Sequence, residues 1–230
     1  VEGLPTAETG SRTRRLMPRI TSLTGSRRTG RVELEVDGET WGSVPDSIAL
    51  SCSLHEGQVL DEEELEALGA EIALAEAVNA ALSCLAYRPR SRVELQRHLR
   101  RKGHTDGPVH AAISRCERLG YIDDGAFALS FVRDRIRFRP SGRRRLLSEL
   151  RSRGVSAEDA DAALDEAFRE FGFSEQDLLR QSAARRVRAL QSVERSTARR
   201  RLTGYLLRRG FAGADVRSIV DELLPDSERS

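Results

Sequence analysis

Apolar residues recur in one pattern at three places along this chain. Two leucines lie four residues apart, a glycine follows the second leucine by four residues, and apolar or small residues stand six and ten positions after the glycine. The three copies are Leu95, Leu99, Gly103, Val109 and Ile113, then Leu146, Leu150, Gly154, Ala160 and Leu164, then Leu202, Leu206, Gly210, Val216 and Val220. Residues four apart share one face of a helix, and glycine readily takes the left-handed conformation that ends one. Each copy therefore predicts a helix, a glycine turn and a second helix.

A third helix is expected to complete each unit. Asp123 and Asp124 follow a turn and precede an apolar stripe that contains Phe127 and Ile136, and an aromatic cluster at residues 168–173 ends the second unit in the same way. The glycines recur about every 50 residues, which is typical of stacked helical repeats. We therefore expect a mainly α fold. Three tandem three-helix repeats would form an elongated array at residues 88–128, 129–173 and 174–225.

Ahead of the repeats, the apolar pattern changes to a period of two. Val32, Leu34 and Val36 alternate with glutamates, and Asp37-Gly38 is typical of the turn between two strands of a hairpin. Residues 48–54 fit either a third strand or a short helix. We expect a small N-terminal β unit at residues 29–60, a disordered basic tail at residues 1–28 and a short tail at residues 226–230.

Local signals also predict where individual helices begin. A long linking helix is expected at residues 61–87, capped by Asp61 and followed by glutamates in its first turn, where the helix dipole favours acidic side chains. Ser91 is expected to cap the next helix, with Glu94 at the capping-box position. Asp106 and Ser156 are the expected N-caps of the helices that follow the first two glycine turns.

The charged residues are divided into blocks of one sign, although the net charge is only +2. Residues 31–76 contain 1 basic and 13 acidic residues, and residues 87–153 contain 18 basic and 7 acidic ones. Residues 154–179 are again acidic, with 1 basic and 8 acidic residues, and residues 180–210 are basic, with 10 and 1. This segregation favours an electrostatic role, in which basic faces meet a polyanion or an acidic partner, over plain solvated helix surfaces.

No motif of catalysis, nucleotide binding or metal binding is present. HExxH, GxxxxGK[ST], GxGxxG and GxSxG arrangements are absent, and Cys52, Cys84 and Cys116 have neither disulfide-framework nor zinc-site spacing. We expect no apolar stretch long enough to span a membrane. We therefore expect no catalytic residue, no metal, no cofactor and no membrane partner, and a cytoplasmic protein that is not an enzyme.

Several runs of residues resemble the RecX family. Ala86 to Gly103 (AYRPRSRVELQRHLRRKG) is similar to the opening repeat of that family, and Gly120 to Ala128 (GYIDDGAFA) is similar to the block that follows it. Pro140 to Val155 (PSGRRRLLSELRSRGV) resembles the second repeat. Three repeats in this order, from about Tyr87 to Leu224, match the organisation of the family, and a β-containing leader resembles its longer members.

The resemblance implies a regulator of the RecA recombinase. Members of this family bind the filament that RecA forms on single-stranded DNA, lie along its helical groove, and restrain strand exchange, ATP turnover and filament growth. They do no chemistry of their own. By this resemblance we expect the RecA filament and single-stranded DNA as partners, weaker binding of duplex DNA, and a role in recombination, DNA repair and the SOS response. Nothing in the sequence suggests an obligate oligomer, so we expect a monomer.

The basic block over the best-matched repeats supplies the candidate contact residues for filament or DNA. The first predicted face consists of Arg88, Arg90, Arg92, Arg97, Arg100, Arg101 and Lys102. The second consists of Arg133, Arg135, Arg137, Arg139, Arg143, Arg144 and Arg145. Each face is expected to meet phosphates or an acidic surface of the recombinase, because guanidinium groups match both geometrically.

Two other classes of function remain open. Helix-turn-helix units with clustered arginines also occur in sequence-indifferent DNA-binding proteins and in transcription factors that read duplex DNA. A structural scaffold that binds acidic proteins and no nucleic acid would carry similar charge blocks. A preference for one duplex sequence would indicate a transcription factor, and capture of a protein partner without DNA binding would indicate a scaffold.

Overall fold

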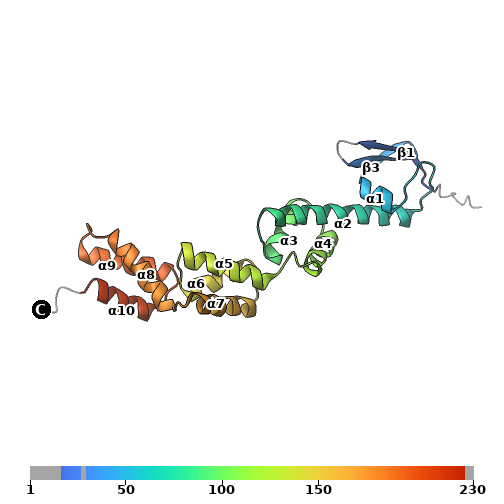
Figure 1. The fold of residues 1–230 in the computed structure, drawn as a ribbon. Coiled ribbons are helices and arrows are strands. Elements are labelled where there is room, and N and C mark those ends of the chain that lie inside the picture. The colour runs from blue at the N-terminus through green and yellow to red at the C-terminus, as the bar shows by residue number, and fades with distance from the viewer. Residues whose placement is uncertain (1–16, 27–29, 226–230) are drawn as a thin grey trace, which may run out of the picture. The chain divides into compact units, whose positions relative to one another are not determined.

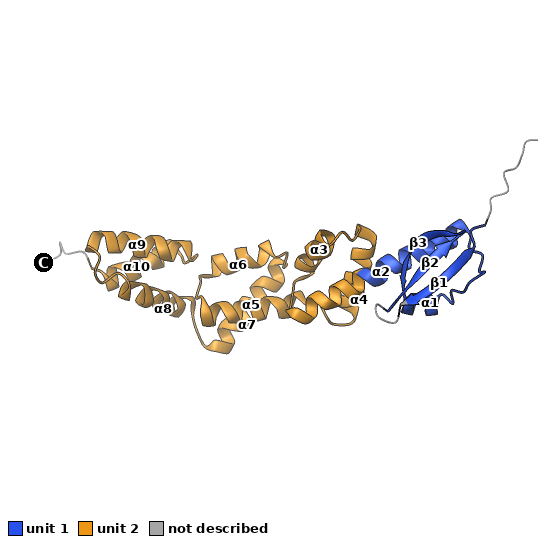
Figure 2. Cartoon of the chain, turned by 90° about the horizontal axis from the view of Figure 1, so that it is seen from above, with its two compact units in different colours: residues 1–76 blue, residues 77–230 orange. Residues whose placement is uncertain are grey.

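The computed structural model describes residues 17–26 and 30–225, and Figure 2 colours the two compact units of the chain, residues 1–76 and 77–230. The expected C-terminal tail, residues 1–16 and 27–28 of the expected N-terminal tail, and residue 29 of the expected β unit lie outside the described residues. The three predicted repeats all fall in the second unit.

A three-stranded antiparallel sheet forms the first unit, with strand order β1 (Ile20–Ser26), β2 (Arg31–Val36) and β3 (Glu39–Pro45). The predicted hairpin between β2 and β3 is confirmed, because Asp37 and Gly38 both take positive φ angles, 51° and 82°. Strand β1 corrects the expectation of a disordered tail through residue 28. Residue Leu23 of β1 pairs with Leu34, and Ile20 is fully buried.

The core of the first unit lies between this sheet and two helices. Helix α1 (Asp46–Ser51) packs on the sheet, so the segment that fitted either a strand or a helix begins as a helix. Helix α2 (Glu62–Tyr87) begins with reciprocal hydrogen bonds between Asp61 and Glu64, both 2.8 Å, which confirms the predicted cap. The buried members of this core are Ile20, Leu34, Val44, Ile48, Leu60 and Leu68.

Helix α2 is apolar enough to require comment. Within the described residues it is the one helix whose length and composition would allow it to cross a membrane, with a mean hydropathy of 1.4 over its most apolar window. The expectation that no such stretch exists is therefore wrong by this measure. Leu68 and Ile72 of α2 pack in the core of the first unit, and Ala81 and Cys84 pack in that of the second. These contacts account for part of its apolar composition, since 28% of that window is buried.

Eight helices follow α2 in the second unit, within the part of the chain that the structure describes (Figure 1). They are α3 (Arg92–Arg101), α4 (Asp106–Arg118), α5 (Asp124–Phe138), α6 (Arg143–Ser152), α7 (Ala157–Phe171), α8 (Glu175–Arg188), α9 (Arg195–Arg208) and α10 (Gly213–Leu223). The predicted Leu-x-x-x-Leu pairs lie on α3, α6 and α9. Both leucines are fully buried in each of these three helices.

The helices group into threes, but not with the expected boundaries. The end of α2 packs with α3 and α4 around Leu95, Leu99 and Ile113, as the first three-helix unit. Helix α5 packs instead on α6 and α7, so it begins the second three-helix unit and does not complete the first three-helix unit. The small Ala128 and the β-branched Val132 of α5 are both fully buried in that second core. Helices α8, α9 and α10 form the third three-helix unit.

The predicted helix ends and caps are largely confirmed. Gly103, Gly154 and Gly210 have φ angles of 92°, 83° and 83°. Ser91 and Ser156 cap α3 and α7 through their side chains. The N-cap of α4, however, is Thr105, and Asp106 is the first residue of that helix, where its charge suits the dipole.

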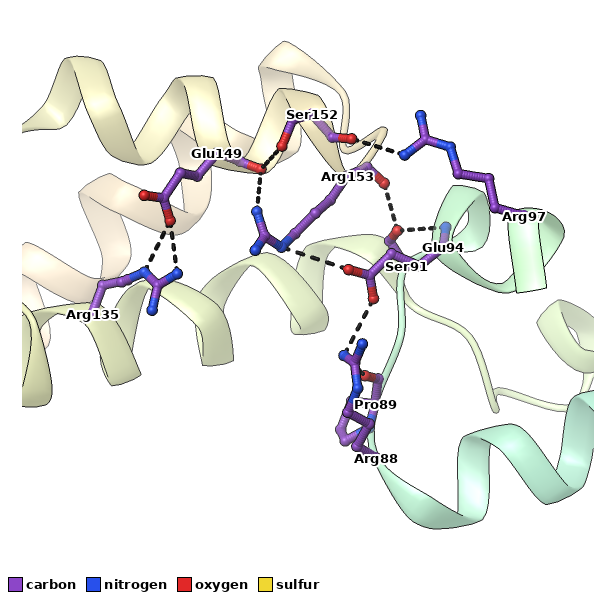
Figure 3. Close-up of polar contacts among 9 residues, drawn as sticks. All are labelled: Arg88, Pro89, Ser91, Glu94, Arg97, Arg135, Glu149, Ser152 and Arg153. Carbon is purple, nitrogen blue, oxygen red and sulfur yellow. Dashed lines mark hydrogen bonds and ion pairs between the residues drawn. The ribbon is translucent and has the colours of Figure 1, made fainter. Parts of the chain in front are cut away.

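Successive three-helix units are joined by one recurring contact. The glycine turn after α6 lies against the start of α3, where Ser91 Oγ donates to the Arg153 carbonyl (2.6 Å) and accepts from the Glu94 N–H (3.1 Å), as Figure 3 shows. A Cβ atom at Gly154 would lie 2.2 Å from the Val93 side chain. The glycine turn after α6 and the start of α3 therefore fit together only because residue 154 is glycine.

An equivalent contact joins the second and third three-helix units. The glycine turn after α9 lies against the start of α6, where the Gly142 N–H donates to the Arg209 carbonyl (2.9 Å). The Arg145 guanidinium donates to the Arg208 carbonyl (2.7 Å). A Cβ atom at Gly210 would lie 2.7 Å from the Arg145 backbone nitrogen. Repeated motifs thus give repeated junctions.

Candidate nucleic-acid interface

Most of the first predicted basic set lies together. Five arginines line one depression of about 480 Å³ with Glu94; they are Arg88, Arg90, Arg97, Arg100 and Arg101. They come from the segment before α3 and from its exposed side. Arg92 forms an ion pair with Glu117 of α4, and Lys102 is the exposed C-cap of α3.

The second predicted set is divided among several places. Arg143, Arg144 and Arg145 line a groove of about 1130 Å³ whose other wall comes from the third unit. Arg133 of α5 forms an ion pair with Glu170 of α7 (2.6 Å), and the Arg137 guanidinium lies over the Phe171 ring.

Two members of this set remain. Arg135 of α5 forms an ion pair with Glu149 of α6 (2.8 Å), and Arg139 is the C-cap of α5. Arg133, Arg135 and Arg137 thus contact neighbouring helices and are not among the residues that line the groove at the start of α6.

Intramolecular carboxylates engage half of the fourteen predicted contact residues. Within the described residues, the paired ones are Arg88, Arg92, Arg100, Arg133, Arg135, Arg143 and Arg145. All of these side chains are at least a quarter exposed, and ion pairs of this kind contribute only about 0–1 kcal/mol each. A phosphate can displace them, but the positive charge they offer is partly neutralised in advance.

Glu149 is the most engaged of these carboxylates. It accepts from Arg135 of α5 at 2.8 Å and from Arg145, one turn earlier on α6, at 2.8 Å, so it connects α5 to α6 (Figure 3 draws its contact with Arg135). Burial raises the pKa of Glu149, but the hydrogen bonds from the two arginines outweigh it, and the net direction is downward. Glu149 is therefore ionised at neutral pH, and these two arginines support the second unit.

The histidine within the first basic set adds no charge at neutral pH. Burial, followed by the charges of Arg90 and Lys102, lowers the pKa of His98. A neutral imidazole is expected here, so the electrostatic field of this surface comes from its arginines and Lys102.

The paired carboxylates at the start of α5 have structural roles. Asp123 caps the helix by accepting from the Ala126 N–H (2.9 Å). Asp124 accepts from the Arg92 N–H (2.8 Å) and so connects α5 to α3. Over residues 17–26 and 30–225, no group of three or more His, Cys, Asp or Glu side chains could hold a metal ion.

The predicted sets leave out the arginines of α8 and α9. The sequence carried a signal for them, because residues 180–210 contain 10 basic and 1 acidic residue. Arg186, Arg200, Arg201 and Arg208 line a depression of about 400 Å³ in the third unit. No carboxylate lines it, in contrast to the two depressions described above.

These features define the class: a protein of tandem three-helix domains with arginine-lined surfaces. Three family models match it in order. They are "RecX, first three-helix domain" at residues 77–116, "RecX, second three-helix domain" at 123–164 and "RecX, third three-helix domain" at 174–220. Their boundaries agree with the grouping of helices seen in the cores. The chain belongs to the RecX family of regulatory proteins.

Curated relatives and solved structures agree. The chain is 39% identical over 161 residues to "Regulatory protein RecX" of Halorhodospira halophila, which covers 68% of this chain and 94% of that protein. It is 34% identical over 148 residues to the protein of the same name from Prosthecochloris aestuarii, covering 64% and 93%. The fold is similar to a solved structure described as "Crystal structure of regulatory protein RecX", with a TM-score of 0.67, 24% identity, and coverage of 89% of this chain and 99% of that one.

Proposed function

We propose that this chain binds the filament of RecA on single-stranded DNA and restrains its ATP turnover, strand exchange and growth. It would act by binding alone, as a cytoplasmic monomer without a cofactor or catalytic residue. The proposal is supported chiefly by one observation. Three RecX domains follow one another in order, and basic surfaces lie on all three of them.

The charge distribution suits a mixed surface of protein and DNA. Basic depressions fit phosphates, and the acidic stretches at residues 31–76 and 154–179 fit basic patches of a protein partner. Naked duplex DNA would need only the basic part. This difference favours a filament over a plain DNA ligand.

Co-sedimentation tests the proposal directly. The chain is mixed with cognate RecA filaments on single-stranded DNA, with the DNA alone and with RecA alone, at physiological salt. We expect it to pellet with the filament at concentrations where neither component alone retains it. Equal retention by DNA alone would favour a sequence-indifferent DNA-binding protein, and retention by RecA without DNA would favour a scaffold for acidic proteins.

A further inference from the structure

We propose that the third three-helix unit carries a phosphate-binding site formed by Arg186, Arg200, Arg201 and Arg208 around Gly204, and that it takes the backbone of single-stranded nucleic acid. For its biological role this inference rests on the proposed function, of which it specifies the DNA contact. Below, "the α8–α9 arginine site" means these four arginines.

Helical spacing brings the site together. Positions 200, 204 and 208 of α9 are four residues apart and lie on one face, and position 201 lies beside them. The opposite face of α9 is buried through Ala198, Leu202 and Leu206. Arg186 reaches the same depression from α8, so two helices present four guanidinium groups to one space of about 400 Å³.

The charges of the α8–α9 arginine site are not compensated within the part of the chain that the structure describes. None of the four arginines forms an ion pair there, in contrast to half of the arginines predicted as contacts in the first two units. Like charges within a Debye length repel one another. An anion would relieve this repulsion, and guanidinium groups match phosphate oxygens geometrically.

Arg186 is held in place by an aromatic ring. Its guanidinium carbon lies 5.3 Å from the centroid of the Tyr205 ring, which holds the side chain against α9. Its Nε atom is buried and has no hydrogen-bond partner among the described residues.

Gly204 shapes the floor of the site. Glycine is unfavourable inside a helix. A Cβ atom at this position would lie 3.1 Å from an Arg208 guanidinium nitrogen. The missing side chain therefore leaves room for Arg208 to fold back over α9 and for a phosphate to approach the helix.

The extent of the site favours a polymer over a single ion. Residues 200 and 208 are about 12 Å apart along the helix axis, at 1.5 Å per residue. Phosphates of a nucleic-acid strand follow one another at about 3.4 Å along the axis of a duplex, so this length covers more than one of them. Several adjacent phosphates would contact the four guanidinium groups together.

The test compares two triple variants of the full chain that lose the same charge. R200Q/R201Q/R208Q alters the site, and R118Q/R169Q/R217Q alters exposed arginines on α4, α7 and α10 that line none of the depressions described here. Binding of a labelled single-stranded oligonucleotide is measured by anisotropy from low to physiological salt, and circular dichroism checks that both variants are folded.

The site variant is expected to bind at least about tenfold more weakly, and the slope of log affinity against log salt is expected to fall by about 2, because each lost phosphate contact removes about 0.7. The control variant should retain nearly full affinity. Equal weakening of both variants, or of neither, would overturn the site. Unchanged DNA binding with a loss of filament binding only would also overturn it, since the arginines would then meet an acidic protein surface.

The same proteins separate this inference from the proposed function. If the wild-type chain fails to affect RecA but the site variant still loses DNA affinity, the α8–α9 arginine site is supported and the regulatory function is contradicted. If the wild-type chain inhibits RecA and neither triple variant differs from it in DNA binding, the site is contradicted and the function is supported.

Discussion

Gly103, Gly154 and Gly210 share one backbone conformation but differ in their surroundings. All three have positive φ angles, which an L side chain adopts at a cost of roughly 1–2 kcal/mol. No atom lies within 4 Å of a Cβ built at Gly103, whereas one built at Gly210 meets the backbone of Arg145. The sequence pattern requires the first property only, and the second arises from the junction between units.

Substituting two of these glycines separates helix termination from docking. Gly103→Ala is expected to lower the free energy of unfolding by about 1–2 kcal/mol, the cost of the left-handed conformation. Gly210→Ala is expected to cost about 1–3 kcal/mol more, because the added methyl group forces α6 away from the turn. Urea unfolding followed by circular dichroism measures both, and equal losses would contradict the junction described here.

Glu194 gives a pH-dependent contribution at the start of α9. Hydrogen bonds from the Ser196 hydroxyl, then from the backbone N–H groups of Ser196 and Thr197, lower the pKa of Glu194 from 4.5 to about 2. A carboxyl whose pKa is lowered by folding stabilises the folded state above its unfolded pKa, and this contribution is lost as the pH falls from about 4.5 towards 2.

Glu194→Gln is therefore expected to be less stable than the wild type at pH 6 and to approach it as the pH falls to about 2.5. The glutamine cannot titrate, so it loses less stability over this interval. Urea unfolding at the two pH values measures the difference. A gap between the proteins that stays constant would show that the charge of Glu194 does not matter.

At the scale of elements, Ser91 connects two three-helix units while it caps α3. Its fully buried hydroxyl serves the Glu94 N–H and the Arg153 carbonyl at once. Ser156, which caps α7, bonds only within its own first turn among the described residues. The two serines therefore offer a matched pair in which one cap also joins a junction.

Ser156→Ala is expected to cost about 1 kcal/mol, the usual loss for an N-cap. Ser91→Ala is expected to cost at least about 1 kcal/mol more, because the Arg153 carbonyl loses its partner in a buried place. The urea midpoints of the two variants, compared at equal m-values, measure the difference in their free energies of unfolding. If Ser91→Ala cost no more than Ser156→Ala, the bond between units would contribute nothing to stability.

Helix α9 offers a prediction in which stability and binding change in opposite directions. Gly204→Ala is expected to raise the free energy of unfolding by roughly 0.5–1 kcal/mol, because alanine is favoured inside a helix. It is also expected to weaken binding of single-stranded DNA, because the methyl group displaces the Arg208 guanidinium. A stabilised variant with unchanged or tighter DNA binding would remove Gly204 from the site.

The elements that sequence alone predicted are those fixed by local interactions. Leucines four apart, glycine ends and serine caps act within one or two turns, so α3, α6 and α9 could be predicted. Strand β1 could not, because Ile20–Ser26 (ITSLTGS) contains few apolar residues and forms through pairing with β2. The grouping of α5 with α7 depended on contacts that only folding reveals.

In the candidate site, too, sequence predicted the local features and missed those that depend on tertiary contacts. The sequence located the basic blocks, since charge is read directly from residue types. It could not show that Glu170, 37 residues away from Arg133, would pair with it, nor that Glu149 would accept from two arginines. It counted the arginines of α8 and α9 but gave no sign that they share one depression.

On the scale of the whole molecule, the repeats combine similar cores with different surfaces. The fully buried leucines are the same in each three-helix unit. Over residues 17–26 and 30–225, the arginine surfaces range from largely paired in the second three-helix unit to unpaired at the α8–α9 arginine site. This difference assigns the units different tasks under our proposals. The third would hold DNA phosphates, and the first two would also meet the protein part of the filament.

The proposed regulation of the RecA filament predicts an effect on its enzymatic activity. The measurement is the single-stranded-DNA-dependent ATPase of cognate RecA, titrated with the full chain. We expect inhibition at well below one molecule per RecA monomer, because one bound molecule would affect many subunits of a filament. No effect until the DNA itself is saturated would contradict the claim, and the chain would then be a basic DNA-binding repeat protein that shares only the fold of its family.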